Sequence, residues 1–598
     1  MSSFFDQSSL CLIPSGYKDS KLYSVKPTDG SGDLTFSRGA DVEATRVNSQ
    51  GLIEKAKVNV LLQSNTFNTT WLNQLGGTIT GGQSGYDGTN DAWLLSKDTS
   101  TFRSIRQVIS FAGVVTYSAY VKAGTLSNVA LRIDSSAGAL QAKYDLSTGT
   151  TDGIGGSYIE YGIDSIGSGW YRIFVTANIS GGTNVHVYVD RDGTTAGNIY
   201  VQDAQLNYGL VAQTYQETTT AAVVSGITND MPRLNYDPAN PTCPSLLLEP
   251  SRQNLLTNDT YFGGSDWSKI GVSPSANNAT SPEGVTNAVL LSETAINDQH
   301  SLYPTISVTS GNAYTASCFV KQGTGSAAPQ YIGFRFRGGG FTDAGGLVVD
   351  LVNKVATYEA GSLTGYKIED YGNGWLRVSI TQSATVTSSS AGLVLFFNNN
   401  ISGSYSTDYL GNVNADMLVY GMQIELGSYP SSLIPTYGSS ATRTADACSK
   451  TGISSLIGQT EGTALLDFQF NGATESIILD IAASGLSPQN RIILYQPSGG
   501  IVQFIILDND VAQVNLASSS YSIGQRLKVA IAYKANDFAF YINGIQIGTD
   551  NSGSVPATSR IDIGNRQDAG FPATISVNQA LLFKTRLSNA DLATLTSL

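Results

Sequence analysis

The sequence predicts an all-β protein made of tandem β-sandwiches of the jelly-roll type, with two homologous modules followed by a third domain. Three observations support this fold class. Short alternating runs rich in Val, Ile, Tyr, Phe and Thr recur between turns rich in Gly, Ser and Asn from about residue 100 onward. Only 14% of the residues are charged although 41% are hydrophobic, so uncharged polar side chains must cover the surface. Several landmark sequences also occur twice in the same order.

The chain has 598 residues, and this length predicts several domains because one hydrophobic core rarely serves more than about 250–300 residues. We expect five consecutive regions: an N-terminal attachment and lead-in segment over 1–60, a first module over 61–220, a Pro-rich linker over 221–253, a second module over 254–447 and a third domain over 448–598.

The repeat is defined by three pairs of matching segments. They are Tyr117–Lys122 with Tyr314–Lys321, Gly167–Arg172 with Gly372–Arg377, and Asp203–Gly209 with Tyr420–Gly427. Because these landmarks keep their order, we predict two copies of one β module, the second with longer loops. Trp170 and Trp375 occupy matching positions in the repeat, which favours buried core residues over sugar-stacking residues.

The third domain has its own signals. Asn543 and Gly544 form a type I′ turn signal between two predicted strands, and Ser588 or Asn589 is suited to cap a short helix that turns Leu592 and Leu595 inward. With Ile561–Gly564, this stretch resembles the laminin-G-like or concanavalin-like jelly-roll lectin family over about the last 150 residues. Within that resemblance, the segment around Asn543 is structural and is not a sugar site.

A second resemblance covers nearly the whole chain. The segments that carry it are Leu34–Asp41, Ala44–Asn48, Gly51–Glu54, Cys243–Pro250, Leu433–Thr436 and Ala441–Asp446. They look like bacteriophage virion proteins of the tail-fibre or capsid-fibre type, which carry β-sandwiches similar to carbohydrate-binding modules. The resemblance implies a homo-oligomer that is made in the host cytoplasm and exposed on the particle surface, with its N-terminal segment against other virion proteins.

Composition excludes several classes of function. The chain has 34 basic and 47 acidic residues, a net charge of −13, which disfavours nucleic acid and anionic lipid as partners. Two histidines are too few for a His-cluster metal site, and the four cysteines have no CxxC spacing. No stretch of about eighteen apolar residues is present, so we expect neither membrane insertion nor a secretion signal. No cofactor is expected.

Candidate carbohydrate-binding residues follow from strand alternation, because only one set of side chains on each strand faces the core. Guanidinium groups beside aromatic rings suit polyols and acidic sugars, although the same pattern fits a solvated sheet face. The outward positions of three predicted strands give seven candidates: Arg132, Asp134, His186, Tyr188, Tyr331, Arg335 and Arg337.

Two acidic turns, Asp190–Gly193 and Asp508–Asp510, offer oxygen ligands for a structural Ca²⁺, but turn chemistry explains them equally well. No acidic pair is singled out for glycosidic cleavage, so no catalytic residue is assigned. We therefore expect a non-enzymatic virion fibre protein that displays weak glycan-binding faces in many copies to the host surface. The alternatives are a polysaccharide depolymerase of a phage tail and a capsid decoration protein without a ligand.

Overall fold

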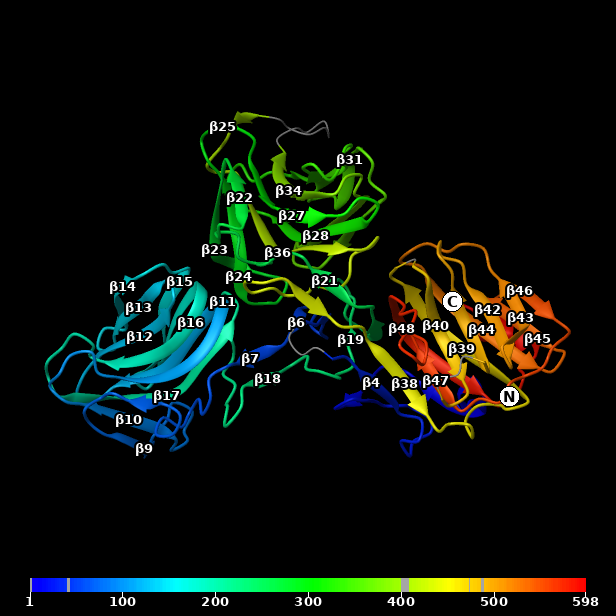
Figure 1. Ribbon diagram of the computed structural model, residues 1–598, viewed down its shortest axis with the longest axis horizontal. Helices are drawn as coiled ribbons and strands as arrows, with labels where there is room; N and C mark the ends of the chain where they lie inside the picture. The colour runs from blue at the N-terminus through cyan, green and yellow to red at the C-terminus, as the bar shows by residue number, and fades with distance from the viewer. Residues whose placement is uncertain (1–2, 40–42, 399–407, 473, 486–488) are drawn as a thin grey trace. The chain divides into compact units, whose positions relative to one another are not determined.

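The computed structural model describes residues 3–39, 43–398, 408–472, 474–485 and 489–598, and its regular secondary structure is almost entirely β-strand (Figure 1). Residues 40 and 41 of the virion-like block at 34–41 lie outside this description. The two helices of the described residues are α1 (Phe4–Gln7) and α2 (Asn589–Leu595). Neither of them has the length and apolar character that a membrane span requires. The all-β prediction is confirmed.

Two compact units make up the chain. Unit 1 combines Met1–Glu54, Ile227–Gln253 and Thr442–Leu598, and unit 2 combines Lys55–Gly226 and Asn254–Ala441. These bounds differ from the expected regions, because the segment expected at 1–60 and the linker expected at 221–253 supply strands to the sheets of unit 1. Their apolar side chains, such as Leu10, Phe36 and Leu246, are fully buried in its core.

Unit 1 contains two large antiparallel sheets. The strands of the first, in spatial order, are β19 (Leu234–Asn235), β20 (Ser245–Leu248), β48 (Ile575–Phe583), β39 (Glu461–Phe470), β44 (Arg526–Lys534), β45 (Phe538–Ile542) and β46 (Ile545–Asp550), and β1 (Leu10–Leu12) also pairs with β48. Those of the second are β2 (Tyr17–Lys18), β3 (Lys21–Leu22), β4 (Leu34–Ser37), β38 (Ala447–Thr451), β47 (Arg560–Ile563), β40 (Ser476–Ala482), β41 (Arg491–Gln496), β42 (Gln503–Asp508) and β43 (Val511–Ala517).

Local signals of the third domain are confirmed in unit 1. Asn543 and Gly544 both have positive φ, as the type I′ turn between β45 and β46 requires. Ser588 caps α2 by accepting a hydrogen bond from the backbone N–H of Asp591, and Leu592 and Leu595 are buried.

The first module of unit 2 is one continuous sheet. In spatial order its strands are β14 (Thr150–Gly155), β13 (Gly138–Asp145), β12 (Asn128–Ser135), β16 (Trp170–Val189), β11 (Ser104–Ala123), β17 (Gly197–Tyr208), β10 (Ala92–Lys97) and β9 (Ile79–Gln83), with β15 (Glu160–Gly167) beside β16 and β8 (Leu72–Asn73) beside β11. Breaks in the pairing register near Phe111 let the two longest strands, β11 and β16, bend around the core.

The second module of unit 2 has two sheets around its own core. The first consists of β22 (Trp267–Ile270), β26 (Ser301–Pro304), β34 (Ser388–Asn398), β29 (Tyr331–Arg337), β30 (Gly346–Asp350) and β31 (Val355–Ala360), with β27 (Ile306–Val308) beside β34. The second consists of β23 (Val272–Thr280), β24 (Thr286–Glu293), β36 (Asp416–Leu426), β28 (Ala313–Gln322), β33 (Leu376–Ser383) and β32 (Gly365–Asp370). The remaining strands form two-stranded ribbons: β5 (Thr45–Val47) with β6 (Ile53–Lys55), β7 (Lys57–Asn59) with β18 (Val223–Ser225), β21 (Arg252–Asn254) with β37 (Ala441–Arg443), and β25 (Asn297–Asp298) with β35 (Tyr409–Leu410).

Buried polar contacts confirm that the two modules are copies of one another. The hydroxyl groups of Thr116 and Thr176 are 2.9 Å apart in the first copy, and those of Thr315 and Thr381 are 2.8 Å apart in the second. The arginine two residues after each repeated tryptophan also donates a hydrogen bond to a matching serine on the neighbouring strand. The pairs are Arg172 with Ser118 and Arg377 with Ser317. Trp170 and Trp375 are both 2% exposed, which confirms that they are buried, although neither belongs to the hydrophobic core cluster of its module.

Candidate functional site

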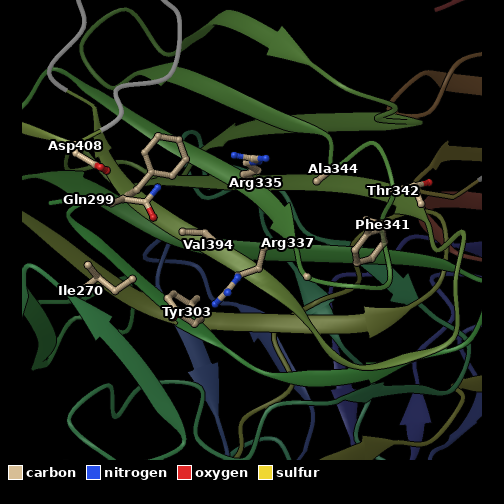
Figure 2. Close-up of a pocket in the computed structure, with 12 residues that line it drawn as sticks. Ile270, Gln299, Tyr303, Arg335, Arg337, Phe341, Thr342, Ala344, Val394 and Asp408 are labelled. Carbon is tan, nitrogen blue, oxygen red and sulfur yellow. The ribbon is translucent and has the colours of Figure 1, made fainter.

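A pocket of about 480 Å³ opens on the second module, against the face of the β29 sheet that points away from the core. Ile332, Phe334 and Phe336 of β29 are buried in the core, and strand alternation therefore turns Arg335 and Arg337 to the opposite face. Both arginines line the pocket (Figure 2). The sequence prediction that these two side chains are outward is confirmed, and the fold brings them together.

The guanidinium group of Arg337 lies over the ring of Tyr303, with its central carbon 3.8 Å from the ring centroid. Figure 2 shows the side chain of Arg337 directed toward Tyr303, which comes from β26. Stacking holds a guanidinium by its flat face and leaves its in-plane N–H groups available to bind an anion. Among the described residues, Arg337 forms no ion pair with a carboxylate.

The floor of the pocket contains a buried aromatic ring. Phe396 of β34 is 2% exposed and lies above Gly333 of β29, its register partner. A Cβ atom at Gly333 would come within 1.9 Å of the Phe396 ring, so the strand requires glycine at this position. Gln299 and Asp408 line another part of the pocket, as Figure 2 shows.

Strand registers place the candidate residues of the two modules at equivalent positions. Arg132 pairs with His186 across β12 and β16, and Arg335 pairs with Val394 across β29 and β34. Two residues further along, Asp134 of the first copy corresponds to Arg337 of the second. The second copy therefore has two arginines where the first has an arginine and an aspartate.

In the first module these groups form a closed network. Arg132 donates from Nε to Asp134 over 2.6 Å, and Nε2 of His186 lies 2.9 Å from the other carboxylate oxygen of Asp134. The rings of His186 and Tyr188 stack with a centroid distance of 5.3 Å. The carboxylate of Asp134 and the imidazole of His186 are thus used within the module.

Two candidates of this face are more buried than the strand pattern indicates. His186 and Tyr188 were expected to be outward, and they are only 4% and 6% exposed. Strand alternation does place them on the face opposite the core, where stacking and the side chain of Arg191, whose guanidinium lies 5.9 Å from the Tyr188 ring centroid, help to cover them. Burial lowers the pKa of His186 below its usual value, although the neighbouring Asp134 acts in the opposite direction.

Tyr331 lies on β29 with the two arginines but lines a different pocket, of about 320 Å³, together with Tyr409 and Asn412. The pocket of Arg335 and Arg337 also contains Tyr303 and Phe396, which sequence reasoning did not select. The sequence could have indicated Tyr303, because it alternates with the buried Leu302 in a short apolar run. It could not have indicated Phe396, because the run Leu393–Phe397 is apolar at every position and does not reveal which side chains face the core.

The two acidic turns that were considered for Ca²⁺ have local partners. Asn509 and Asp510 adopt positive φ, and Asp508 accepts a hydrogen bond from the hydroxyl of Ser554. Asp190 also has positive φ and lies 3.8 Å from the ammonium group of Lys97. Within the described part of the chain, no three His, Cys, Asp or Glu side chains are grouped so that they could hold a metal ion.

Comparison with known proteins found no family model that matches the chain and no curated protein that matches it. Solved structures resemble parts of it. The carbohydrate-binding module CBM40 of the Ruminococcus gnavus IT-sialidase, bound to α2,3 sialyllactose, is 16% identical with a TM-score of 0.22, over 25% of this chain and 91% of that one. The NanB sialidase of Streptococcus pneumoniae is 15% identical with a TM-score of 0.22, over 24% of this chain and 26% of the enzyme, so the match spans about a quarter of that protein. A pentraxin of Limulus polyphemus is 21% identical with a TM-score of 0.20, over 23% of this chain and 70% of that one.

Proposed function

We propose that the chain is a non-enzymatic glycan-binding protein, and that the pocket of the second module holds acidic sugars. The observation that carries this proposal is the pair Arg335 and Arg337 on one strand, beside Tyr303 and Phe396, in a pocket of about 480 Å³. An arginine recognises a carboxylate, sulfate or phosphate through paired N–H groups, and Tyr303 adds an aromatic side chain for apolar contact with a sugar.

Local charge supports an anionic ligand. The chain as a whole carries a net charge of −13, yet this pocket has two arginines and one aspartate, Asp408, among its lining residues. The net negative charge of the chain repels an acidic glycan, whereas the two arginines of the pocket attract it. The charge distribution therefore favours binding of an acidic glycan at this pocket over the rest of the surface.

The virion setting is part of the proposal and rests on the sequence resemblance to tail-fibre and capsid-fibre proteins. In that setting the chain is exposed on a phage particle, homo-oligomeric, and bound to glycans of the host surface without a cofactor. Weak sites suffice there, because many copies on one particle raise the effective concentration of the second and later contacts. Contacts with other virion proteins would then involve unit 1, since the N-terminal strands belong to its sheets.

A glycan array with the purified full-length protein tests this function, with release of reducing sugar followed in the same samples. We expect binding to glycans that contain uronic acid, sialic acid or sulfate, and no release. Arg337→Ala should weaken binding at least about tenfold, which corresponds to about 1.4 kcal/mol. Lys367→Ala is the matched control, because Lys367 is a partly exposed cation of the same module that pairs with Glu369 outside the pocket.

The remaining outcomes separate the alternatives. Release of sugar would support a depolymerase, and the absence of both binding and release would favour a decoration protein without a ligand. Equal binding by the wild type and by Arg337→Ala would show that any glycan site lies elsewhere.

A further inference from the structure

A second pocket of the second module, of about 300 Å³, lies between the lead-in residues 255–258, the start of β22 and the end of β26. Its lining includes Asn258, Asp266, Trp267 and Pro304. None of these residues lines the pocket that contains Arg335 and Arg337, which we call the arginine pocket. The first module provides an internal comparison, because it has the same strands and a side chain fills the corresponding place.

The pairing registers of β8 with β11 and of β22 with β26 align the two modules around this second pocket. Arg106 pairs with Leu72 in the first copy, and Tyr303 pairs with Ser268 in the second, so the following residues, Gln107 and Pro304, are equivalent. The same alignment matches Trp71 with Trp267 and the residues before them, Thr70 with Asp266. The lead-ins align through Asn59 and Asn254, each of which accepts a hydrogen bond from the backbone N–H two residues later. Leu62 therefore corresponds to Thr257.

In the first module, the side-chain amide of Gln107 occupies this place. Its oxygen accepts a hydrogen bond from the backbone N–H of Leu62 over 2.8 Å, and its nitrogen donates to the carbonyl of Leu62 over 2.7 Å and to the hydroxyl of Thr70 over 3.3 Å. Gln107 is 3% exposed. Proline at position 304 has no amide, and the second module has a pocket at the corresponding position.

Two polar atoms beside the pocket have no hydrogen-bond partner among the residues that the structure describes. They are Nε1 of Trp267 and Oδ1 of Asn258, in residues that are only 3% and 4% exposed. The equivalent Trp71 donates from Nε1 to the carbonyl of Gln63 over 3.1 Å, so the open donor is a property of the second copy alone. A buried donor or acceptor without a partner destabilises the free protein, and a ligand that supplies the partner removes this penalty.

We propose that this pocket binds the acetamido group of an N-acetylated sugar in the space that the side chain of Gln107 fills in the first module. An acetamido group offers the same pair, one C=O acceptor and one N–H donor. The indole N–H of Trp267 is the donor for its carbonyl, and Oδ1 of Asn258 is the acceptor for its N–H.

The rim of the pocket favours a sugar as the carrier of this group. Side chains with hydroxyl groups surround it, namely Thr257, Ser265, Ser268 and Thr305. The carboxylate of Asp266 accepts hydrogen bonds from Thr257 and Asn258 over 2.7 and 2.8 Å, which holds the acceptor-rich side of the pocket in place. Hydroxyl groups and a carboxylate are suited to the hydroxyls of a pyranose ring.

The test uses the full chain labelled with ¹⁵N in its tryptophan indoles, titrated with N-acetylglucosamine and with glucose. The chain has five tryptophans, and Trp267→Phe assigns the signal of interest. We expect N-acetylglucosamine to shift the Trp267 signal in a saturable manner and glucose to leave it unchanged. No shift with N-acetylglucosamine, or an equal shift with glucose, would overturn the proposal. Tighter binding of N-acetylglutamine amide than of the sugar would assign the pocket to a peptide instead.

Pro304→Gln rebuilds the amide of the first module and should weaken N-acetylglucosamine binding at least about tenfold. Pro304→Ala leaves the space open and should stay within about threefold of the wild type. The other four indole signals report whether each variant is folded. This test is independent of the arginine pocket, because Arg337→Ala should leave the Trp267 shift intact; loss of the shift in Pro304→Ala as well would contradict the assignment.

Discussion

Asp134 and Arg337 occupy the same position in the two copies of the repeat and carry opposite charges. Asp134 pairs with both Arg132 and His186, whereas Arg337 stacks on Tyr303 and stands beside a second arginine. An acidic side chain therefore pairs with its neighbours in the first copy, where the second copy has a basic side chain that lines a pocket.

Arg337→Asp should convert the second copy toward the first. The new carboxylate would be placed to pair with Arg335 as Asp134 pairs with Arg132, and it would repel an acidic glycan. We expect binding in isothermal titration to weaken more than about tenfold. The thermal unfolding midpoint should hardly change, because an exposed pair contributes about 0–1 kcal/mol. Unchanged affinity would contradict the anion site.

Low pH should reduce the folding stability of the first module, because His186 is buried. Its folded pKa is lowered, mainly by burial, so the unfolded chain binds a proton more readily and stability declines as the pH falls below the usual histidine value of 6.5. The slope is at most about 1.4 kcal/mol per pH unit for one proton. Chemical denaturation between pH 8 and 5 should therefore show a flatter pH dependence for His186→Gln than for the wild type. Parallel curves would contradict this role.

Asp203 should make the first module less stable as the pH rises, which is the opposite of the effect of His186. Burial, opposed by a hydrogen bond from Tyr86 over 2.8 Å, raises the pKa of Asp203 to about 7. The folded state therefore holds a proton that the unfolded chain releases near pH 3.8, and stability is lost as the pH rises from about 4 to 7.

Asp203→Asn removes this loss, and asparagine tolerates the positive φ of 53° at this position. At pH 8 the variant should exceed the wild type by on the order of 1 kcal/mol, and at pH 4 the difference should vanish. Thermal melts at the two pH values measure both. A variant that is less stable at pH 8 would show that the hydrogen bond to the charged form dominates.

Unit 1 should depend on a buried ionic network that joins its three segments. Asp446 contacts Arg38 over 3.4 Å and also bonds to Arg233, which in turn bonds to Glu249 over 2.6 Å. Asp446→Ala leaves buried arginines without this carboxylate, and we expect the unfolding free energy of unit 1 to fall by about 3–5 kcal/mol. Lys534→Ala, which removes an exposed pair with Glu461, should change it by less than about 1 kcal/mol. Similar losses in both variants would show that burial of the network is not decisive.

Local sequence signals predicted the class of the fold and much of its repeat. Alternation, turns such as Asn543–Gly544 and matched landmarks act over a few residues, and their reading does not depend on distant contacts. The same alternation correctly placed Arg335 and Arg337 on the face opposite the core. It failed for His186 because the pattern indicates which face a side chain takes, and it does not show what covers that face.

The sequence by itself determined the all-β class, the two copies of the module, the burial of Trp170 and Trp375 and the outward direction of the β29 arginines. Only the tertiary structure decided that the N-terminal strands complete the sheets of unit 1, that Asp134 closes one face, and that Pro304 leaves open the place of Gln107. The reason is physical: strand direction follows from neighbouring residues, whereas pairing, burial and pockets arise between side chains that are far apart in the chain.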